Sequence, residues 1–279
     1  MRTVPRYGCS GKATASVRVQ ERTHQEIAHG RMLAASDTER IWGWGTPAGR
    51  CRAGRRARLI STSARLSPGG SALELGCGTG VFTEYFAATG TTLVAVDLSP
   101  ELLEKAKQRN VSPDRVTYME CRFEEAVFEK PFDAVVGSSV LHHMELQDAL
   151  RHIYNALKPG GILAFAEPNM LNPQIFVERK LSGRPGFSHV SPQETAFFRW
   201  SLKRAIEKAG FVEVEIRPFD WLHPLTPQRW VGALNRLGRK LERIPVLCEF
   251  SGSLLICGKR PPGTVRKDCG QESVPKDHL

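Results

Sequence analysis

The sequence predicts an α/β fold in which a mostly parallel sheet carries helices on both faces. From about residue 71 onward, short apolar runs of strand length alternate with longer helical stretches. Gly, Pro and Ser stand at the boundaries between these runs, where turns and helix caps are expected. Hydrophobic residues make up 41% of the 279 residues, enough for a sizeable core. Sheets of this kind bind ligands beyond the carboxyl ends of their strands.

The elements follow in order along the chain. Ser99 and Pro100 begin a helix that runs to Arg109, because Ser is a good N-cap and Pro fits the first helical turn. A Lys158-Pro159-Gly160-Gly161 turn ends the helix that precedes the fifth strand. Two insertions, 169–190 and 220–245, interrupt the second half. The expected strands are 72–76, 92–96, 116–120, 132–138, 162–166, 211–217 and 252–258, and the expected helices are 81–88, 100–109, 146–157 and 191–209.

Charge and cysteine content narrow the function classes. The formal net charge is +10, and much of the excess lies in arginines before residue 60. That basic arm suits nucleic acid, yet no base-stacking aromatics are interleaved with it, so we regard nucleic acid as an unfavoured partner. The seven cysteines show no C-x-x-C pair, which predicts neither a metal site nor a disulfide framework and favours a reducing, cytoplasmic compartment. No apolar run reaches the roughly 18 residues of a membrane span.

The strongest motif is Leu73-Glu74-Leu75-Gly76-Cys77-Gly78-Thr79-Gly80, which places glycines at alternate positions between a strand and a helix. Glycine lets the backbone turn sharply and approach a ligand closely. A dinucleotide fingerprint counted from Gly76 and Gly78 puts its third glycine position on Val81. The spacing therefore disfavours a nicotinamide dinucleotide.

Asp97 adds independent weight, because it ends the second strand 17 residues after Gly80. A carboxylate there can accept hydrogen bonds from both ribose hydroxyls of an adenosine ligand. The alternative is that Asp97 only caps the next helix.

Four motifs in this order resemble the class I S-adenosylmethionine-dependent methyltransferases of the broad small-molecule kind. They are the glycine motif, Val94-Ala95-Val96-Asp97-Leu98-Ser99, Phe132-Asp133-Ala134-Val135-Val136 followed by Leu141-His142-His143, and Leu157-Lys158-Pro159-Gly160-Gly161. The similarity runs from about Ala72 to Pro168 and more weakly to Arg260. It implies a Rossmann-like seven-stranded sheet whose last strand is antiparallel, with S-adenosyl-L-methionine as cofactor.

The resemblance also implies which residues hold the cofactor. The glycines would pass beside its methionyl part, Asp97 and Leu98 would flank the ribose and adenine, and Ser138 and Ser139 would lie by the sulfonium. Arg122 and Phe123 replace the acidic and small residues often found after the third strand, so the backbone amide of Phe123, or Glu124, would serve the adenine. The full predicted set is Glu74, Gly76, Cys77, Gly78, Gly80, Asp97, Leu98, Phe123, Ser138 and Ser139.

Three residues are candidates for the chemistry. His142 and His143 follow the fourth strand, and either could take a proton from the acceptor or simply order the loop. Glu167 ends the fifth strand and could orient the acceptor or cap the insertion. No metal is predicted. Candidate linings of an acceptor pocket are Trp42, Trp44, Phe197, Phe198, Trp221 and Trp230, with Arg50, Arg55, Arg56 and His223 as candidates to meet an anionic acceptor.

These patterns predict methyl transfer to a small molecule, preferably to oxygen. The alternatives are an N- or C-methyltransferase of the same fold, a nucleotide-cofactor oxidoreductase, and a nucleic-acid-associated protein that uses the basic arm. We expect a disordered arm at 1–20, one domain at 21–260 and a disordered tail at 261–279. Within the domain, 21–66 would be a helical extension that closes over the cofactor, 67–168 the cofactor-binding half and 169–260 the substrate-side half.

Overall fold

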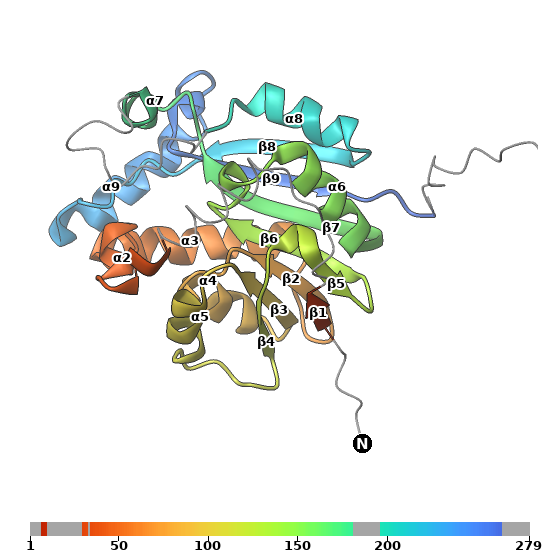
Figure 1. The fold of residues 1–279 in the computed structure, drawn as a ribbon. Helices are drawn as coiled ribbons and strands as arrows, with labels where there is room; N and C mark the ends of the chain where they lie inside the picture. The colour runs from red at the N-terminus through yellow and green to blue at the C-terminus, as the bar shows by residue number, and fades with distance from the viewer. Residues whose placement is uncertain (1–6, 10–29, 33, 181–195, 264–279) are drawn as a thin grey trace, which may run out of the picture.

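A seven-stranded sheet forms the centre of the computed structural model, which describes residues 7–9, 30–32, 34–180 and 196–263 (Figure 1). A separate two-stranded sheet pairs β1 with β5. The strands are β1 (Tyr7–Cys9), β2 (Ser71–Leu75), β3 (Thr92–Asp97), β4 (Val116–Glu120), β5 (Ala126–Phe128), β6 (Phe132–Ser138), β7 (Leu157–Pro168), β8 (Val212–Phe219) and β9 (Ser253–Lys259). The helices are α2 (Thr38–Ile41), α3 (Pro47–Ser63), α4 (Val81–Ala87), α5 (Pro100–Lys107), α6 (Leu146–Ala156), α7 (Pro173–Lys180), α8 (Arg199–Lys208) and α9 (Gln228–Leu241), with 3-10 turns η1 (Phe123–Glu125), η2 (Leu141–His143) and η3 (Leu247–Phe250).

The strand order is β4-β3-β2-β6-β7-β9-β8. The first five strands of that order are parallel, and β9 runs antiparallel to both of its neighbours, β7 and β8. This confirms the predicted Rossmann-like sheet with an antiparallel last strand. The order reverses between β2 and β6, so the ligand-binding edge is expected beyond their carboxyl ends.

Helices cover both faces of the sheet (Figure 1). One core cluster joins α3 and α4 to the sheet through Ile60 and Phe86, both fully buried. The other joins α6 and α8 through Ile153 and Ile206, also fully buried. The sheet is therefore buried on both sides, which explains why its central strands are continuous apolar runs rather than alternating ones.

Three features differ from the sequence prediction. β7 begins at Leu157 rather than at residue 162, because Leu157 pairs with Phe132, and Gly160 and Gly161 bond to Arg260 after β9. The insertion at 220–245 contains the 14-residue helix α9. The small sheet of β1 and β5 was not expected, and the rest of 1–20 and most of 261–279 lie outside the described residues.

The segment expected as an N-terminal extension is not a separate layer. Its long helix α3 buries Ala53, Ala57 and Ile60 against the sheet, so the part from residue 47 belongs to the core. Two arginines of this segment are ion-paired within the fold. Arg52 pairs with Asp220 at 2.8 Å, and Arg55 pairs with Glu242. These two cations are therefore not available to bind nucleic acid, as the basic-arm hypothesis would require.

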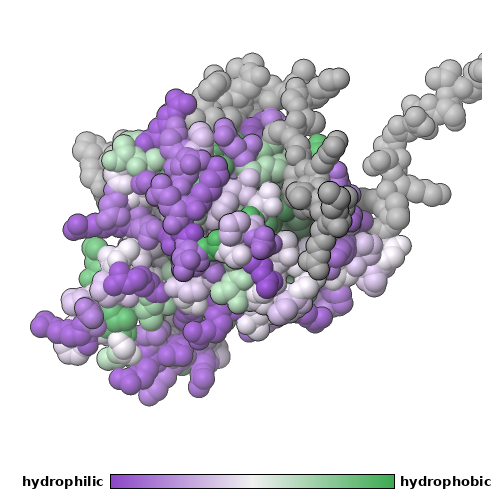
Figure 2. All heavy atoms as spheres, turned by 90° about the horizontal axis from the view of Figure 1, so that it is seen from below, coloured by the Kyte–Doolittle hydropathy of each residue, from purple (hydrophilic) through white to green (hydrophobic). Residues whose placement is uncertain are grey.

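The surface seen from below is mostly hydrophilic, with apolar side chains in small separate groups (Figure 2). Among the helices of the described part of the chain, none combines the length and apolarity that a membrane span requires. Cys121 is disulfide-bonded, contrary to the expectation from cysteine spacing, whereas Cys51, Cys77, Cys248 and Cys257 are free thiols.

Candidate active site

The glycine loop lies between β2 and α4, at the carboxyl edge of the sheet. Gly76, Gly78 and Gly80 all have positive φ, at 63°, 53° and 77°. A Cβ on Gly76 would lie 2.5 Å from Cγ2 of Val140, so only glycine fits there. Gly80 is the N-cap of α4, so the loop turns the chain from strand to helix. Gly76 is exposed, whereas Gly78 and Gly80 are buried.

Asp97 is tied to this loop. Its Oδ2 accepts a hydrogen bond from the Gly78 N–H at 2.7 Å, and its Oδ1 accepts one from the Ser99 N–H at 2.9 Å. Ser99 in turn caps α5 through Leu102, so Asp97 itself is not the helix N-cap. Desolvation raises the pKa of the Asp97 carboxyl, and the hydrogen bonds from Ser99 and Gly78 oppose that rise. Asp97 and the glycine loop therefore form one unit.

Two of the predicted cofactor residues have buried side chains. Glu74 lies within β2 with 2% of its surface exposed, and burial raises the pKa of its carboxyl to about 8. Its Oε2 has no hydrogen-bond partner among the described residues. Cys77 is buried as well, and burial raises the pKa of its thiol well above the usual range, so it is no nucleophile.

The segment after β4 is explained by its own packing. The Phe123 ring is buried and meets His152 of α6 edge-on, with centroids 6.0 Å apart, so its side chain is a core group. Arg122 pairs with Glu125 at 3.0 Å and with Glu124 at 3.6 Å. Only backbone groups of this turn remain as candidates for an adenine contact, in line with the proposed use of the Phe123 amide.

Arg56 is the site residue whose importance the sequence did not reveal. It projects from α3 with 3% exposure and reaches the end of β6, where its Nη1 donates to Ser139 Oγ at 2.9 Å and to Ser138 Oγ at 3.2 Å. Nη2 donates to Ser253 Oγ. All three partners are neutral hydroxyls, and its Nε has no hydrogen-bond partner among the described residues.

Among the residues that the structure describes, no carboxylate forms an ion pair with this buried guanidinium. It lies over the ring of Trp44, 5.2 Å from the centroid, and near Phe219. Burial is the largest cause that lowers the pKa of Arg56, to about 10, which still leaves it cationic near neutral pH. A buried cation is stable only when paired, so the arrangement favours an anionic group beside it.

Ser139 shows how β6 ends at this point. It has a positive φ of 56°, which is strained for a residue with a side chain. Its amide donates to Ala166 O at 2.8 Å, and its hydroxyl accepts from Arg56. Strain of this kind persists where the surroundings fix it, and it often marks functional loops.

Trp42, just after α2, lies against the glycine loop. A Cβ on Gly78 would come within 3.0 Å of Cη2 of the Trp42 ring. Trp44 meets Phe82 of α4 edge-on at 5.4 Å between centroids. The chain before α3 thus contacts the loop, and its closing over the cofactor stays a prediction.

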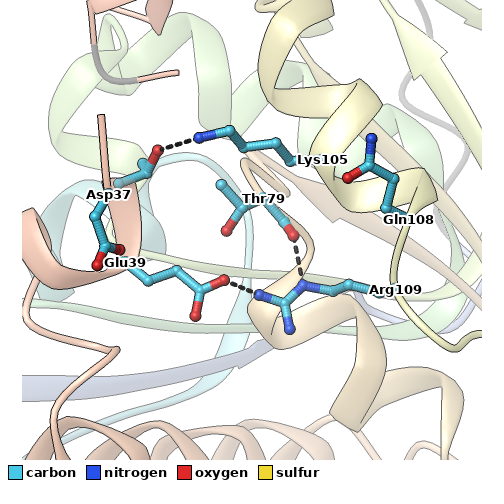
Figure 3. A pocket seen from close by; sticks show the side chains of 7 residues that line it. Asp37, Glu39, Thr79, Lys105, Gln108 and Arg109 are labelled. Atoms are coloured by element: carbon cyan, nitrogen blue, oxygen red, sulfur yellow. Dashed lines mark hydrogen bonds and ion pairs between the residues drawn. The ribbon is translucent and has the colours of Figure 1, made fainter. Parts of the chain in front are cut away.

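A charged pocket of about 360 Å³ lies between α2 and α5 and touches the loop only at Thr79 (Figure 3). Arg109 donates to the Thr79 carbonyl at 2.5 Å and also pairs with Glu39 and Glu84. Lys105 donates to Ser36 O and Thr38 Oγ1, both at 3.1 Å. The cations in the pocket are thus already paired, and neither Asp97 nor Arg56 lines it. We interpret this pocket as part of the polar contact that holds α2 against α5 and the glycine loop.

His142 and Glu167 are brought together as a buried pair. The His142 Nδ1 and Glu167 Oε2 atoms are 2.7 Å apart, and Glu167 Oε1 accepts the N–H groups of Val140 and Leu141, both at 2.9 Å. Burial alone would raise the pKa of Glu167, but the His142 contact and the two amides lower it. The His143 ring lies beside His142, 4.1 Å between centroids. Glu167 therefore anchors the loop that follows β6.

The other candidates for an acceptor pocket divide in two. Arg56, Trp42 and Trp44 lie at the carboxyl edge, as described above. Trp230 is 52% exposed on α9, and Phe198 is 42% exposed, so neither lines an interior pocket. Arg50 is bound to Gly45 O and His223 to Gln174, both at the surface. Within the described residues, no group of three or more His, Cys, Asp or Glu side chains is placed to hold a metal ion.

Comparison with known proteins agrees with this geometry. A family model described as a methyltransferase domain matches residues 73–165, which include the glycine loop, Asp97 and the His142 loop. Nodulation protein S of Rhizobium tropici is 30% identical over 148 residues, 52% of this chain and 60% of that protein. The mitochondrial ubiquinone biosynthesis O-methyltransferase of Mus musculus is 36% identical over 126 residues, 41% of this chain and 34% of that protein. The chain thus covers less than two thirds of the length of each.

The fold agrees as well. The structure of the N-methyltransferase NodS from Bradyrhizobium japonicum, solved with S-adenosyl-L-homocysteine, superposes with a TM-score of 0.58 at 20% identity. The match covers 86% of this chain and 99% of that one. Residues 73–165 of the chain thus match a methyltransferase domain, and the fold of the chain is that of a solved methyltransferase structure.

Proposed function

We propose that the chain transfers a methyl group from S-adenosyl-L-methionine to a small-molecule acceptor, with oxygen as the receiving atom. The observation that carries the proposal is the meeting of three features at the carboxyl edge of the sheet. They are the glycine loop, Asp97 bonded to that loop, and the buried cation Arg56 at the end of β6. Each matches a different part of the cofactor.

The residues fit the cofactor on structural grounds. The Asp97 carboxylate suits the ribose hydroxyls, because each of its oxygens has a lone pair beyond the amide that it accepts. The unpartnered Nε of Arg56 and its excess charge suit the methionyl carboxylate. The close approach of Trp42 to Gly78 leaves the loop flanked by an aromatic wall.

When bound, the cofactor supplies an activated methyl group on a sulfonium. The protein's task is then alignment, since an in-line displacement depends on the position of the attacking atom. In the proposed roles, Asp97 and Arg56 hold the two ends of the cofactor, and the backbone of the glycine loop passes between them. Ser138 and Ser139 hold Arg56 in place through their hydroxyls.

For an oxygen acceptor, we propose His142 as the group that takes the proton. Its Nδ1 is held by Glu167, so a proton from the acceptor would go to Nε2. Glu167 is then a positioning residue, because its oxygens are already used by His142 and two backbone amides. In this division of roles His142 takes the proton, Glu167 positions His142, and His143 packs on the His142 ring.

Transfer to nitrogen is the second candidate, since the NodS neighbour carries the name of an N-methyltransferase. A neutral amine can attack without a base, so it has no need of His142. A matched pair of phenol and amine acceptors separates the two. If the chain methylates the phenol, and His142→Asn lowers that turnover and changes its pH profile, the result supports oxygen as the acceptor. Turnover with the amine alone, unchanged in His142→Asn, supports nitrogen.

The first test of the whole proposal is calorimetric binding of S-adenosyl-L-methionine and S-adenosyl-L-homocysteine, followed by a screen of acceptors for methyl transfer. We expect micromolar binding, as is common for such cofactors, and transfer to at least one acceptor class. A folded protein that binds neither compound would contradict the proposal.

A further inference from the structure

Helix α9 has an inverted arrangement for a helix on a globular protein. The residues that it turns toward the protein are polar or small. Asn235 donates to Cys51 Sγ of α3 at 3.4 Å, and Glu242 at the C-cap binds Arg55. Gly238 is the one fully buried residue of the helix, and a Cβ there would lie 2.9 Å from that of Trp221. The packed face therefore lies along 235, 238 and 242, spaced by three and four residues.

The apolar side chains of α9 point away from the protein. Trp230, Leu234 and Leu237 are exposed by 52%, 41% and 51% and share one side of the helix, at spacings of four and three. An amphipathic helix normally buries this stripe against its own core. Here the core contact is made by the other face, so the apolar stripe is presented to the surroundings.

Neighbouring segments continue the apolar surface. Beyond the helix, Ile244, Val246 and Phe250 are exposed by 38% or more. Asn172, just before α7, donates to Phe250 O at 2.8 Å, which brings α7 with its exposed Phe176 to the same end of the molecule. Contiguous exposed apolar surface of this kind marks a site of interaction.

A row of cations flanks the stripe. Arg229, Arg236, Arg239, Lys240 and Arg243 are all exposed, and none forms an ion pair with another residue that the structure describes. The one acidic group at this helix, Glu242, is already bound to Arg55. On a helical wheel of 100° per residue the apolar stripe lies about 110° to one side of the packed face, and the cations are centred about 120° to its other side, with Arg239 nearest to the packed face. The exposed part of α9 is thus apolar on one side and basic on the other.

We propose that α9, with the apolar residues that follow it to η3, binds the surface of an anionic phospholipid bilayer. A helix that combines an apolar face bearing Trp with a basic flank is the form that lies in the plane of a membrane interface. Acidic headgroups supply the negative charges that pair with the five cations, while Trp230, Leu234 and Leu237 enter the boundary of the acyl region.

Charge argues against a second copy of the chain as occupant. A symmetric dimer through this face would bring two sets of five cations together, with no acidic partner on either side. A nucleic acid would satisfy the cations but would leave the apolar stripe in water. A bilayer surface meets both requirements at once.

The test is sedimentation of the full chain with large unilamellar vesicles, either of phosphatidylcholine alone or with about 30% phosphatidylglycerol. We expect binding to the anionic vesicles, weaker binding to the neutral ones, and a decrease with added salt. The double variant Leu234→Glu/Leu237→Glu should lose at least about tenfold in partition, since two exposed leucines proposed to enter the acyl boundary are replaced by charges that the headgroups repel.

A matched control isolates the face. Val127 and Val212 are exposed by 52% and 41%, close to Leu237 and Leu234, but lie on β5 and β8. Val127→Glu/Val212→Glu adds the same charge and should bind as the unmodified chain does. Far-UV circular dichroism and thermal unfolding of every variant report whether the fold is intact, and neither measurement depends on the proposed activity.

Three outcomes would overturn the proposal. The first is no sedimentation with either vesicle. The second is equal binding by the leucine variant and the unmodified chain, which would mean adsorption through charge alone. The third is a dimer by light scattering that Leu234→Glu/Leu237→Glu converts to a monomer while vesicles leave it unbound, which would assign the face to a second copy.

Discussion

The Oδ2 atom of Asp97 accepts the Gly78 N–H at 2.7 Å, so the end of β3 holds the tip of the glycine loop. Gly78 lies in the loop after β2 and Asp97 ends β3, 19 positions apart in the sequence. One carboxylate therefore does two things: it fixes the loop, and it presents its remaining lone pairs at the position proposed for the ribose. A loop that is fixed before the ligand arrives loses less entropy on binding.

Replacing Asp97 by Ala should weaken binding of S-adenosyl-L-homocysteine by at least about tenfold. Each hydrogen bond to a charged group contributes roughly 1.5–3 kcal/mol, and the loop also loses its tether. Isothermal titration calorimetry measures the effect. Asp114→Ala is the control, because Asp114 is an exposed carboxylate in the loop before β4. Equal affinity of Asp97→Ala and Asp114→Ala would remove the ribose assignment.

Glu74 predicts a pH dependence of stability. Burial raises its pKa to about 8 from an ordinary value of 4.5, so the folded state holds a proton that the unfolded state releases between these values. Stability then falls as pH rises from about 4.5 to about 8, by at most about 1.4 kcal/mol per pH unit, and is level above that range. Glu74→Gln has no carboxyl to titrate at this position, so its stability should depend less on pH over this range.

Urea unfolding of both proteins at pH 6, 7, 8 and 9 measures this difference. The free energy of unfolding of Glu74→Gln, relative to that of the unmodified chain, should rise with pH up to about pH 8. Glu104→Gln, at an exposed position on α5, should follow the unmodified chain throughout. Parallel curves for all three would show that Glu74 is charged in the folded protein.

The cofactor half of the fold was predictable because each of its signals is local. Strands β4 and β6 have the expected bounds, since an apolar run between turn residues fixes a strand wherever it lies. Asp97 was found because the position after a strand places a side chain at the ligand edge. The glycines were found for a similar reason, because positive φ excludes most other residues.

What the sequence did not reveal depends on contacts between distant segments. Arg56 looked like one of several surface arginines, and only the packing of α3 shows that it meets Ser139 and Ser253, 83 and 197 residues away. Helix α9 was missed because 220–245 was interpreted only as an insertion, although Trp230, Leu234 and Leu237 have helical spacing. Glu74 is part of the glycine motif, yet the motif did not reveal that its side chain is buried within β2.

Glu167 should be important for stability even without substrate. Glu167→Ala leaves the Val140 and Leu141 amides and the His142 ring without their acceptor, and should cost about 3 kcal/mol. Glu167→Gln keeps one oxygen for the amides and should cost less. Thermal unfolding measures both, with Glu207→Ala on the exposed side of α8 as the control.

The Glu167 contribution also has a pH signature. Since its pKa is lowered in the folded state, its stabilisation is present above the ordinary pKa of 4.5 and is lost as pH falls through the folded value. The advantage over Glu167→Gln should therefore persist at pH 7 and shrink in acid. A gap between the two proteins that widened toward low pH would contradict a salt-bridged Glu167.

Trp42 should contribute to cofactor affinity through its ring against Gly78. Trp42→Ala should weaken binding of S-adenosyl-L-homocysteine by about tenfold, because it removes an aromatic wall from the loop. Its effect on the unfolding temperature should be small, since the ring is only half-buried. Trp230→Ala is a control of the same residue type on the outer side of α9. Equal affinity in the two variants would place Trp42 outside the site.

Arg56 can be assigned to one end of the cofactor by comparing two ligands. S-adenosyl-L-homocysteine carries the amino acid carboxylate, whereas 5′-methylthioadenosine keeps the adenosine and lacks it. If Arg56 pairs with that carboxylate, Arg56→Met should weaken S-adenosyl-L-homocysteine by about a hundredfold, in keeping with the loss of a buried charged pair.

The same substitution should leave the affinity for 5′-methylthioadenosine nearly unchanged, because that ligand presents no anion to the guanidinium. Arg56→Lys keeps the charge but loses the forked guanidinium that bonds Ser139 and Ser253. Its affinity for S-adenosyl-L-homocysteine should therefore lie between that of the unmodified chain and that of Arg56→Met. An equal loss for both ligands would mean that Arg56 only holds the β6 loop in place. Full affinity for both in Arg56→Met, with turnover of an acidic acceptor lost, would assign the cation to the acceptor instead.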